Sequence, residues 1–223
     1  MIVLAIRVEV WGDYALFTRP EMKVERVSYD VMTPSAARGI LEAIYWHPGL
    51  RWIIDRIHVC SPIRFTNVRR NEVKSTIGTR AIKQIMERGK GESFITTTEN
   101  IQQRAAMVLQ NVHYIIEAHF EMTERAAPED NPGKFQDIMK RRLEKGQCYH
   151  MPYFGTREFP ANFAQCETYP SCPESLKGEK DLGYMLLDMD YISQGNIQPM
   201  FFRAVLHDGV LVVPSLDSGE VIK

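Results

Sequence analysis

A tyrosine, a tryptophan and a histidine stand together in the run Tyr45-Trp46-His47-Pro48. A histidine near its free pKa can act as a general acid or base at neutral pH. A tyrosine hydroxyl, with a free pKa of about 10, more readily orients a substrate hydroxyl or donates a hydrogen bond to a phosphate oxygen. From periodicity alone, Tyr45 is better explained as the last core residue of a helix and Trp46 as a packing residue. The run therefore offers acid–base chemistry, with core packing as the competing explanation.

The segment 33–48 that carries these side chains is predicted to be a helix with both ends specified. Thr33 can cap the first turn, and Pro34 suits the first helical position because its missing N–H would be unpaired there. Pro48 ends the helix. Apolar residues recur three and four positions apart and form one face that must pack on a sheet. They are Ala37, Ile40, Leu41 and Ile44.

Two further histidines lie in the most apolar stretch of the chain, residues 104–122. From residue 111 the stretch alternates, which predicts a strand with one core face and one mostly polar face. His113 and His119 fall on the polar face, with Glu117 between them. Histidines on such a face are more often solvated than catalytic, so this is a weak signal for chemistry.

Positive charge is concentrated in one segment although the net charge is only −1. The cations there are Arg64, Arg69, Arg70, Lys74, Arg80, Lys83, Arg88 and Lys90, against only Glu72 and Glu87. Such a distribution is expected for a polyanion partner, and the alternative is a solvated face with mobile side chains. Interleaved Phe65, Asn67 and Asn71 add stacking and hydrogen-bonding groups, which favours RNA or DNA.

The composition excludes several classes of protein. Apolar residues make up 44% of the chain and charged residues 25%, as in ordinary globular proteins, and no apolar run reaches the roughly 20 residues of a membrane span. The first residues alternate like a strand and not like a signal peptide, so we expect a cytoplasmic protein without a membrane partner. The cysteines form no C-x-x-C pair and the histidines no ligand spacing. We therefore expect no metal site and no cofactor.

The order of elements predicts an α+β protein. Strand, helix, strand and then a long strand with a polar face suit a ferredoxin-like (RRM-like) domain with an antiparallel sheet at residues 1–125. A helix and a β-rich C-terminal part are expected at 126–223. The other expected elements are strands at Ile2–Trp11, Arg51–Cys60 (with a bulge near Asp55), Ile63–Val68, Phe94–Thr98 and Leu182–Asp190, helices at Ala81–Arg88 and Lys134–Lys145 (the latter with basic residues Lys140, Arg141, Arg142 and Lys145), and a hairpin at Pro199–Val213 turning at Asp208-Gly209.

Four separated motifs resemble a known family. They are Gly12-Asp13-Tyr14-Ala15-Leu16-Phe17, Ile44-Tyr45-Trp46-His47-Pro48, Arg69-Arg70-Asn71-Glu72-Val73 and Pro152-Tyr153-Phe154-Gly155-Thr156-Arg157-Glu158-Phe159. In this order they look like the signature of the type I-C (Dvulg) CRISPR-associated Cas family five, subtype d. The resemblance covers nearly the whole chain.

The resemblance implies an activity and partners. The family belongs to the RAMP superfamily, and subtype d is a metal-independent endoribonuclease that cuts the repeat hairpin of precursor CRISPR RNA. The product stays bound, and the protein becomes a subunit of the surveillance complex (Cascade) with the other Cascade subunits; duplex DNA is a further partner to consider. Most relatives in other subtypes have lost cleavage and only cap the 5′ handle of the RNA, so a non-catalytic handle-binding subunit is the alternative.

The resemblance also implies site residues. Family catalysis is attributed to a Tyr, a His and a Lys. The Tyr corresponds to Tyr45; His113 is our choice for the His, with His47 and His119 as rivals, and Lys74 is the candidate for the Lys. The residues expected to bind RNA are His47, Arg64, Arg69, Arg70, Asn71, Arg80, Lys83, Arg104 and His119.

Overall fold

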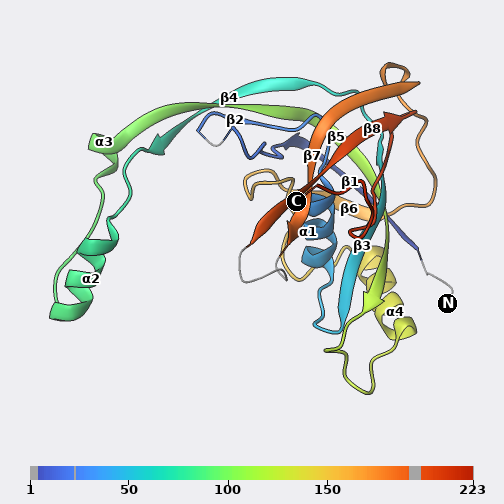
Figure 1. The fold of residues 1–223 in the computed structure, drawn as a ribbon, viewed down its shortest axis with the longest axis horizontal. Helices are drawn as coiled ribbons and strands as arrows, with labels where there is room; N and C mark the ends of the chain where they lie inside the picture. The colour runs from blue at the N-terminus through green and yellow to red at the C-terminus, as the bar shows by residue number, and fades with distance from the viewer. Residues whose placement is uncertain (1–4, 23, 191–196, 223) are drawn as a thin grey trace.

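A single nine-stranded sheet organises the molecule, whose computed structural model describes residues 5–22, 24–190 and 197–222 (Figure 1). Its main path runs β6-β1-β5-β3-β9-β8-β7, and β2 and β4 also pair with β5. The strands are β1 (Ile6–Ala15), β2 (Arg26–Val27), β3 (Leu50–Val59), β4 (Phe65–Val73), β5 (Ile101–Met122), β6 (Asn162–Gln165), β7 (Glu179–Asp190), β8 (Gln198–His207) and β9 (Val210–Val212). The helices are α1 (Pro34–Ile44), α2 (Thr79–Arg88), α3 (Thr97–Asn100) and α4 (Pro132–Lys145), with a 3-10 turn at Glu174–Leu176.

The sheet is almost entirely antiparallel, as expected for an α+β protein. Among the described strands only the short β2 runs parallel to its neighbour β5. The long β5 lies at the centre, pairing with β1 on one side and β3 on the other. The predicted bulge is confirmed, because the β3–β5 register shifts between Ile54 and Arg56.

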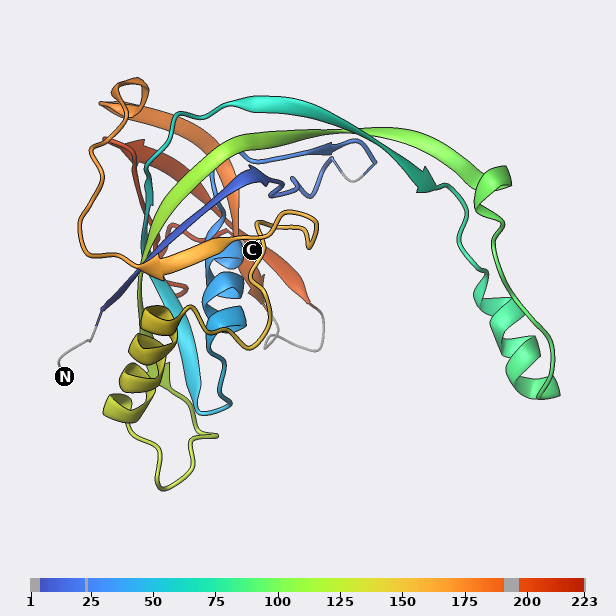
Figure 2. The same cartoon turned by 180° about the vertical axis from the view of Figure 1, so that it is seen from behind.

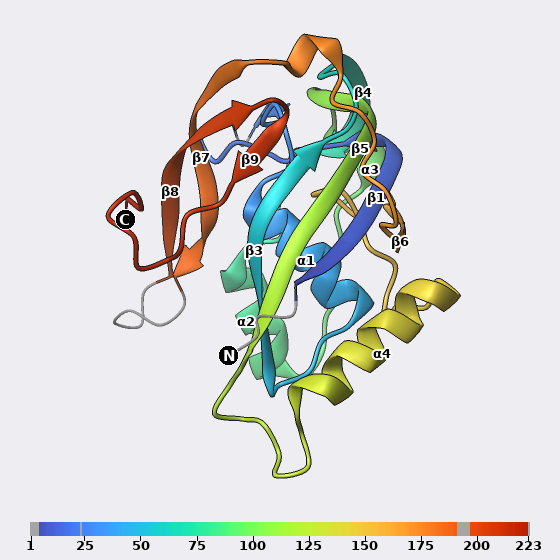
Figure 3. The ribbon, with the colours of Figure 1, turned by 90° about the vertical axis from the view of Figure 1, so that its right-hand side faces the viewer.

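Helices α1 and α4 lie on the same side of the sheet (Figure 3). Helix α1 begins as predicted: Thr33 Oγ1 accepts the Ala36 N–H at 3.2 Å, and Pro34 occupies the first turn. Its apolar face, including Ile40, Leu41 and Ile44, is buried against the even-numbered residues of β5. The side chain of Asn131 caps α4, which buries Phe135, Met139 and Leu143 in the same core.

The boundary predicted at residue 125 stays a prediction. It falls between β5 and α4, but one core cluster includes residues from both sides of it. Strand β6 also pairs with β1, so a C-terminal segment completes the edge of the N-terminal sheet.

The β-rich C-terminal part packs against α1 and β3. Strands β7, β8 and β9 form a meander whose last turn, at Asp208-Gly209, is the predicted hairpin turn, with positive φ at both residues. Strand β9 pairs with β3. The Arg38 guanidinium on α1 binds both carboxylate oxygens of Asp188 on β7 at 2.8 Å, which fixes this part to the helix.

An arm projects from the body (Figures 1 and 2). We define it as β4, the first half of β5 (Ile101–Val108) and the residues 74–100 between them. Helix α2, near its tip, has no buried residue. The arm therefore has little core of its own.

Three details of the sequence-based prediction were wrong. Residues Phe94–Thr98 form no strand: α3 begins at Thr97, and no neighbouring strand runs beside this segment to pair with it. Strand β1 does not end at Trp11, as predicted, but continues to Ala15. Gly12 is used for a close approach, because a Cβ there would lie 2.9 Å from the Phe154 ring. Strand β4 is also longer than the predicted Ile63–Val68.

Candidate active site

Tyr45 lies at the C-terminal end of α1, on the helix side of the sheet. Its backbone N–H donates to Leu41 O at 2.8 Å, and its carbonyl accepts the Trp52 indole N–H at 2.8 Å. The side chain is 5% exposed and packs edge-on against Phe135. Burial raises the pKa of the Tyr45 hydroxyl, so it remains a proton donor at neutral pH. The structure therefore places Tyr45 in the core, with its hydroxyl protonated at neutral pH.

His47 packs beside Tyr45, on the same Phe135 ring, with 4.9 Å between the ring centroids. Its Nδ1 accepts the Gly49 N–H at 3.0 Å, so the neutral ring carries its proton on Nε2. The Asp130 carboxylate lies 3.8 Å from the same Nδ1. In the neutral tautomer set by the Gly49 hydrogen bond, the His47 Nε2–H has no hydrogen-bond partner among the described residues and can donate to a substrate oxygen.

Two cations complete this group. Lys134 Nζ lies 2.8 Å from Asp130 Oδ1, and that hydrogen bond raises the pKa of Lys134 and lowers the pKa of Asp130. The Arg142 guanidinium lies over the Tyr45 ring, 5.0 Å from its centroid, and donates to the Ile44 carbonyl. We call Tyr45, His47, Asp130, Lys134 and Arg142 the α1–α4 cluster. It contains a proton carrier, a hydroxyl donor and two positive charges, which is a set suited to a phosphodiester transition state.

His113 lies on the opposite face of the sheet. The even-numbered neighbours Val112 and Tyr114 are buried towards α1, and alternation along β5 turns His113 away from them. Its Nε2 lies 2.7 Å from Glu9 Oε1, and its backbone N–H donates to Ser61 Oγ. The structure does not bring His113 and Tyr45 together.

His119 lies on the same outer face as His113, as the alternation predicts. Its Nδ1 lies 2.9 Å from both carboxylate oxygens of Asp55, beside the bulge in β3. It is therefore also separated from Tyr45 by the sheet.

Lys74 follows β4, far out on the arm. Its backbone N–H donates to Asn100 O, next to the start of β5, whereas Tyr45 lies near the end of β5. Most of the 22 residues of β5 therefore lie between Lys74 and Tyr45. At about 3.3 Å per residue, this is a length of roughly 60 Å along the strand. The catalytic roles predicted for Tyr45, His113 and Lys74 stay predictions, but the three do not share one site in this structure.

Apart from His47 and His119, the residues expected to bind RNA divide into two groups. Free, exposed groups with no ion pair to another described residue are Arg64, Arg69, Asn71, Arg80 and Lys83. Arg70 and Arg104 instead hold the base of the arm: Arg70 pairs with Glu158 and lies over Phe159, and Arg104 lies 3.8 Å from Glu72. Arg70 Nη2 and Arg104 Nε are themselves buried and have no hydrogen-bond partner among the described residues, so these two arginines are less accessible to RNA than the first group.

The sequence did not indicate the contribution of Asp130, Lys134 and Arg142. Basic residues were recognised on the helix at 134–145, but their position against Tyr45 depends on how α4 packs. The available signal was Asn131-Pro132, which starts α4 and places Lys134 in its first turn.

Neither metal ligation nor membrane insertion has a visible site in the described residues. No group of three or more His, Cys, Asp and Glu side chains there is arranged to hold a metal ion. No described helix is long and apolar enough to cross a membrane.

Two solved structures share the fold. One is the crystal structure of a CRISPR-associated protein, with a TM-score of 0.70 and 24% identity, covering 99% of this chain and 97% of that one. The other is a functionally uncharacterized protein from Streptococcus mutans, with a TM-score of 0.70 and 23% identity, covering 99% and 98%. At these identities the likeness concerns the fold alone.

Sequence comparison identifies the family. The Cas_Cas5d family model, described as "CRISPR-associated protein (Cas_Cas5)", matches residues 5–214. A curated relative from Mannheimia succiniciproducens is 51% identical over 221 residues, 97% of each chain, and one from Thermus thermophilus is 39% identical over 229 residues, 94% of this chain and 91% of the other. Both are named CRISPR pre-crRNA endoribonuclease Cas5d. This chain belongs to the Cas5d family, which confirms the resemblance read from its four motifs.

Proposed function

We propose that this protein is an endoribonuclease that cleaves precursor CRISPR RNA at the α1–α4 cluster. The activity is the one named for both curated relatives, which match nearly the whole chain. The observation that supports this location is the gathering of a Tyr, a His and a Lys around Phe135 and Asp130, with Arg142 beside them. These are the residue types to which family catalysis is attributed.

The chemistry we propose uses the ribose 2′-OH as nucleophile. Its oxygen attacks the adjacent phosphorus, the bond from phosphorus to the 5′ oxygen breaks, and a 2′,3′-cyclic phosphate and a 5′-OH result. The 2′ proton passes to solvent. In this step His47 takes up a proton at Nδ1, exchanges the Gly49 N–H hydrogen bond for the Asp130 carboxylate 3.8 Å away, and donates its Nε2 proton to the leaving 5′ oxygen.

The remaining cluster residues stabilise charge in this proposal. Lys134 and Arg142 are cations at neutral pH and neutralise the negative charge that develops on the phosphate oxygens. The Tyr45 hydroxyl, held neutral by burial, donates a hydrogen bond to one of those oxygens. Because two side-chain cations supply the positive charge, the cleavage we propose needs no metal ion.

We also propose that the first part of the fold is ferredoxin-like. The elements β1-α1-β3-β5-α4-β6 follow the β-α-β-β-α-β order of that fold, and their strands lie in the order β6-β1-β5-β3. This interpretation makes α1 and α4 the two helices of the unit, and the α1–α4 cluster lies where they meet.

The partners we propose follow from the family and from the arm. The exposed cations Arg69, Arg80 and Lys83 suit the backbone of the RNA repeat hairpin, and the same charges suit duplex DNA. Exposed apolar side chains on the arm, such as Met86 and Phe94, each 76% exposed, suit contact with other Cascade subunits. A non-catalytic subunit that binds the 5′ handle is the alternative.

The deciding experiment is cleavage of repeat RNA by the purified protein in EDTA. A discrete cut that a 2′-deoxy nucleotide at the scissile position abolishes supports the proposal. His47→Ala is expected to lower the cleavage rate by about a hundred- to ten-thousand-fold while RNA binding is retained. Tyr45→Phe is expected to bind normally and cut poorly.

His113→Ala and Lys74→Ala are the matched comparisons, because they were the sequence-based candidates. Normal cutting by His47→Ala together with loss in His113→Ala would move the chemistry to the other face of the sheet. Tight binding of uncut RNA by the wild-type protein would instead support the handle-binding alternative.

A further inference from the structure

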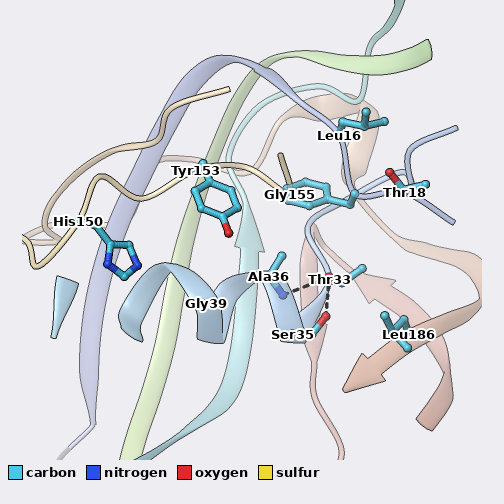
Figure 4. A pocket seen from close by; sticks show the side chains of 11 residues that line it. Leu16, Thr18, Thr33, Ser35, Ala36, Gly39, His150, Tyr153, Gly155 and Leu186 are labelled. Atoms are coloured by element: carbon cyan, nitrogen blue, oxygen red, sulfur yellow. Dashed lines mark hydrogen bonds between the residues drawn. The ribbon is translucent and has the colours of Figure 1, made fainter. Parts of the chain in front are cut away.

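A cavity lies beside α1 (Figure 4). We call it the α1 pocket. It lies between the first half of α1, the end of β1, the loop that carries His150 and Tyr153, and Leu186 of β7. Its volume is about 370 Å³, within the range of small-ligand sites. None of the residues in the proposed cleavage step lines it.

The pocket has an open floor because residue 39 is a glycine. Gly39 stands in the middle of α1, where glycine is about 0.5–1 kcal/mol less favourable than alanine. No neighbouring atom explains the choice: a Cβ built there would have nothing within 4 Å. The missing side chain therefore serves no packing role and leaves the space beside the helix open.

The opposite wall is fixed by the backbone of the loop. Gly155 has φ +79°, and a Cβ there would lie 2.0 Å from Leu16 O, so only glycine allows the loop to approach β1 this closely. Leu16 N–H also donates to Phe154 O at 3.1 Å. These contacts hold the neighbouring Tyr153 in place, and Figure 4 shows its ring and that of His150 directed towards α1 near Gly39.

The lining chemistry selects for an uncharged, planar, polar ligand. The pocket is lined by hydroxyl groups, including those of Thr18, Ser35 and Tyr153, by the His150 imidazole and by apolar side chains, with no Asp, Glu, Lys or Arg. The Tyr153 hydroxyl and the His150 ring nitrogens form no hydrogen bond with another described residue. A phosphate would require a cation, whereas a nucleobase requires a ring to stack on and donors or acceptors for its edge.

We propose that the α1 pocket binds one unpaired nucleobase of the repeat RNA, between Tyr153 and His150. This inference rests on the proposed function and adds to it a subsite that sets the cleavage position. His150 N–H and Tyr149 N–H both donate to Ala43 O, so the pocket wall is attached to the end of α1 that carries Tyr45. Gly39 and Tyr45 are about 9 Å apart along the helix, a distance that neighbouring nucleotides of one strand can span.

The test is a substitution at Gly39 whose side chain occupies the α1 pocket. Gly39→Leu places an apolar side chain in the open space and removes a glycine from a helix, so the variant is expected to fold. Gly39→Ala is the matched control, adding a single methyl group. Each protein is titrated with a series of repeat RNAs in which one unpaired nucleotide at a time is abasic.

In the wild-type protein and in Gly39→Ala, one abasic position is expected to weaken binding by roughly tenfold, as the loss of one stacked base does. In Gly39→Leu the intact RNA is expected to bind about as weakly as that abasic RNA, and the abasic substitution should have no further effect. His150 is exposed, so His150→Ala should not lower the stability of the protein. In this variant the same abasic nucleotide should cause a smaller loss of RNA affinity than in the wild-type protein.

Additive effects of Gly39→Leu and every abasic substitution would overturn the inference. Binding is measured without reference to cleavage, so the failure of this inference is distinct from the failure of the proposed function. If the protein never cuts RNA, but Gly39→Leu removes the effect of one abasic nucleotide, the nucleobase pocket is supported and the proposed nuclease activity is contradicted. If the protein cuts RNA, but Gly39→Leu changes the effect of no abasic nucleotide, the nuclease activity is supported and the nucleobase pocket is contradicted.

Discussion

At the scale of single residues, burial shifts the pKa of a side chain and so decides whether it is protonated at neutral pH. Tyr45 is almost fully buried, yet its ring lies against Arg142 and close to His47. Periodicity placed it in the core and the family resemblance assigned it to catalysis, and its position at the end of α1 is compatible with both. His113 has the opposite environment, since it is paired with Glu9 on the far face of the sheet.

The partly buried thiol of Cys60 gives a pH prediction at this scale. Burial raises the pKa of Cys60 from about 9 to about 12. The folded state therefore holds this proton more tightly than the unfolded chain, so its contribution to stability is complete below pH 9 and is lost as the pH rises towards 12. As the pH rises above 9, the free energy of unfolding should therefore fall, because the unfolded chain releases this proton first.

Urea denaturation from pH 8 to 10.5 tests this for the wild-type protein and Cys60→Ala. The variant is expected to lose less stability over this range. An identical slope in both proteins would show that the Cys60 thiol does not titrate differently in the folded state.

At the scale of elements, α1 is the helix around which the candidate sites gather. Its buried face fixes it to the sheet, its C-terminal end presents Tyr45, and Gly39 opens the α1 pocket on its exposed side. The arm has the opposite character. Because α2 buries nothing, its side chains are available to RNA or to a protein partner.

Removal of the arm tip should therefore affect RNA binding more than folding. Lys74 N–H donates to Asn100 O at 3.0 Å, so residues 75–99 can be replaced by the two-residue turn Asn-Gly. We expect the melting temperature to change by only a few degrees. The dependence of log Kd on log salt should become shallower by up to about 3, because four cations are lost and each phosphate contact on a single strand contributes about 0.7.

A full-length control separates charge from shape. It replaces the same cations with glutamine, at Arg80, Lys83, Arg88 and Lys90. The same change in slope in both variants is expected. An unchanged slope would mean that the arm tip does not contact the RNA backbone.

At the scale of the whole molecule, one core links segments that are distant in the sequence. Phe135 of α4 contacts the rings of Tyr45 and Phe120, and β6 pairs with β1. The C-terminal meander is joined to the same body through β9 and the Arg38–Asp188 ion pair. The predicted division at residue 125 can be tested against this arrangement.

Expression of residues 1–125 alone is the direct test. The fragment lacks Phe135, Met139 and Leu143 and exposes the edge of β1, so we expect no cooperative thermal unfolding by circular dichroism. Fragment 1–170, which restores α4 and β6, is the matched comparison and should recover part of the transition. Cooperative unfolding of 1–125 would instead support two independent domains.

The sequence by itself determined the elements whose signals are local. The capped helix α1, the long alternating strand β5, the bulge near Asp55 and the Asp208-Gly209 turn were all predictable, because each depends on neighbouring residues along the chain. The four motifs were sufficient to identify the family. The ends of the strands were less predictable, as β1 and β4 show, because the length of a strand depends on partner strands that lie elsewhere in the sequence.

Only the tertiary structure decided which candidate residues meet. His113 and Tyr45 are separated by the thickness of the sheet, and Lys74 by the length of the arm, although the sequence-based hypothesis combined all three in one site. Lys134, Arg142 and Asp130 join Tyr45 because α4 packs across the end of α1, a contact between distant segments. Side-chain alternation is local, but the choice of neighbour depends on long-range packing, and that packing assembles the site.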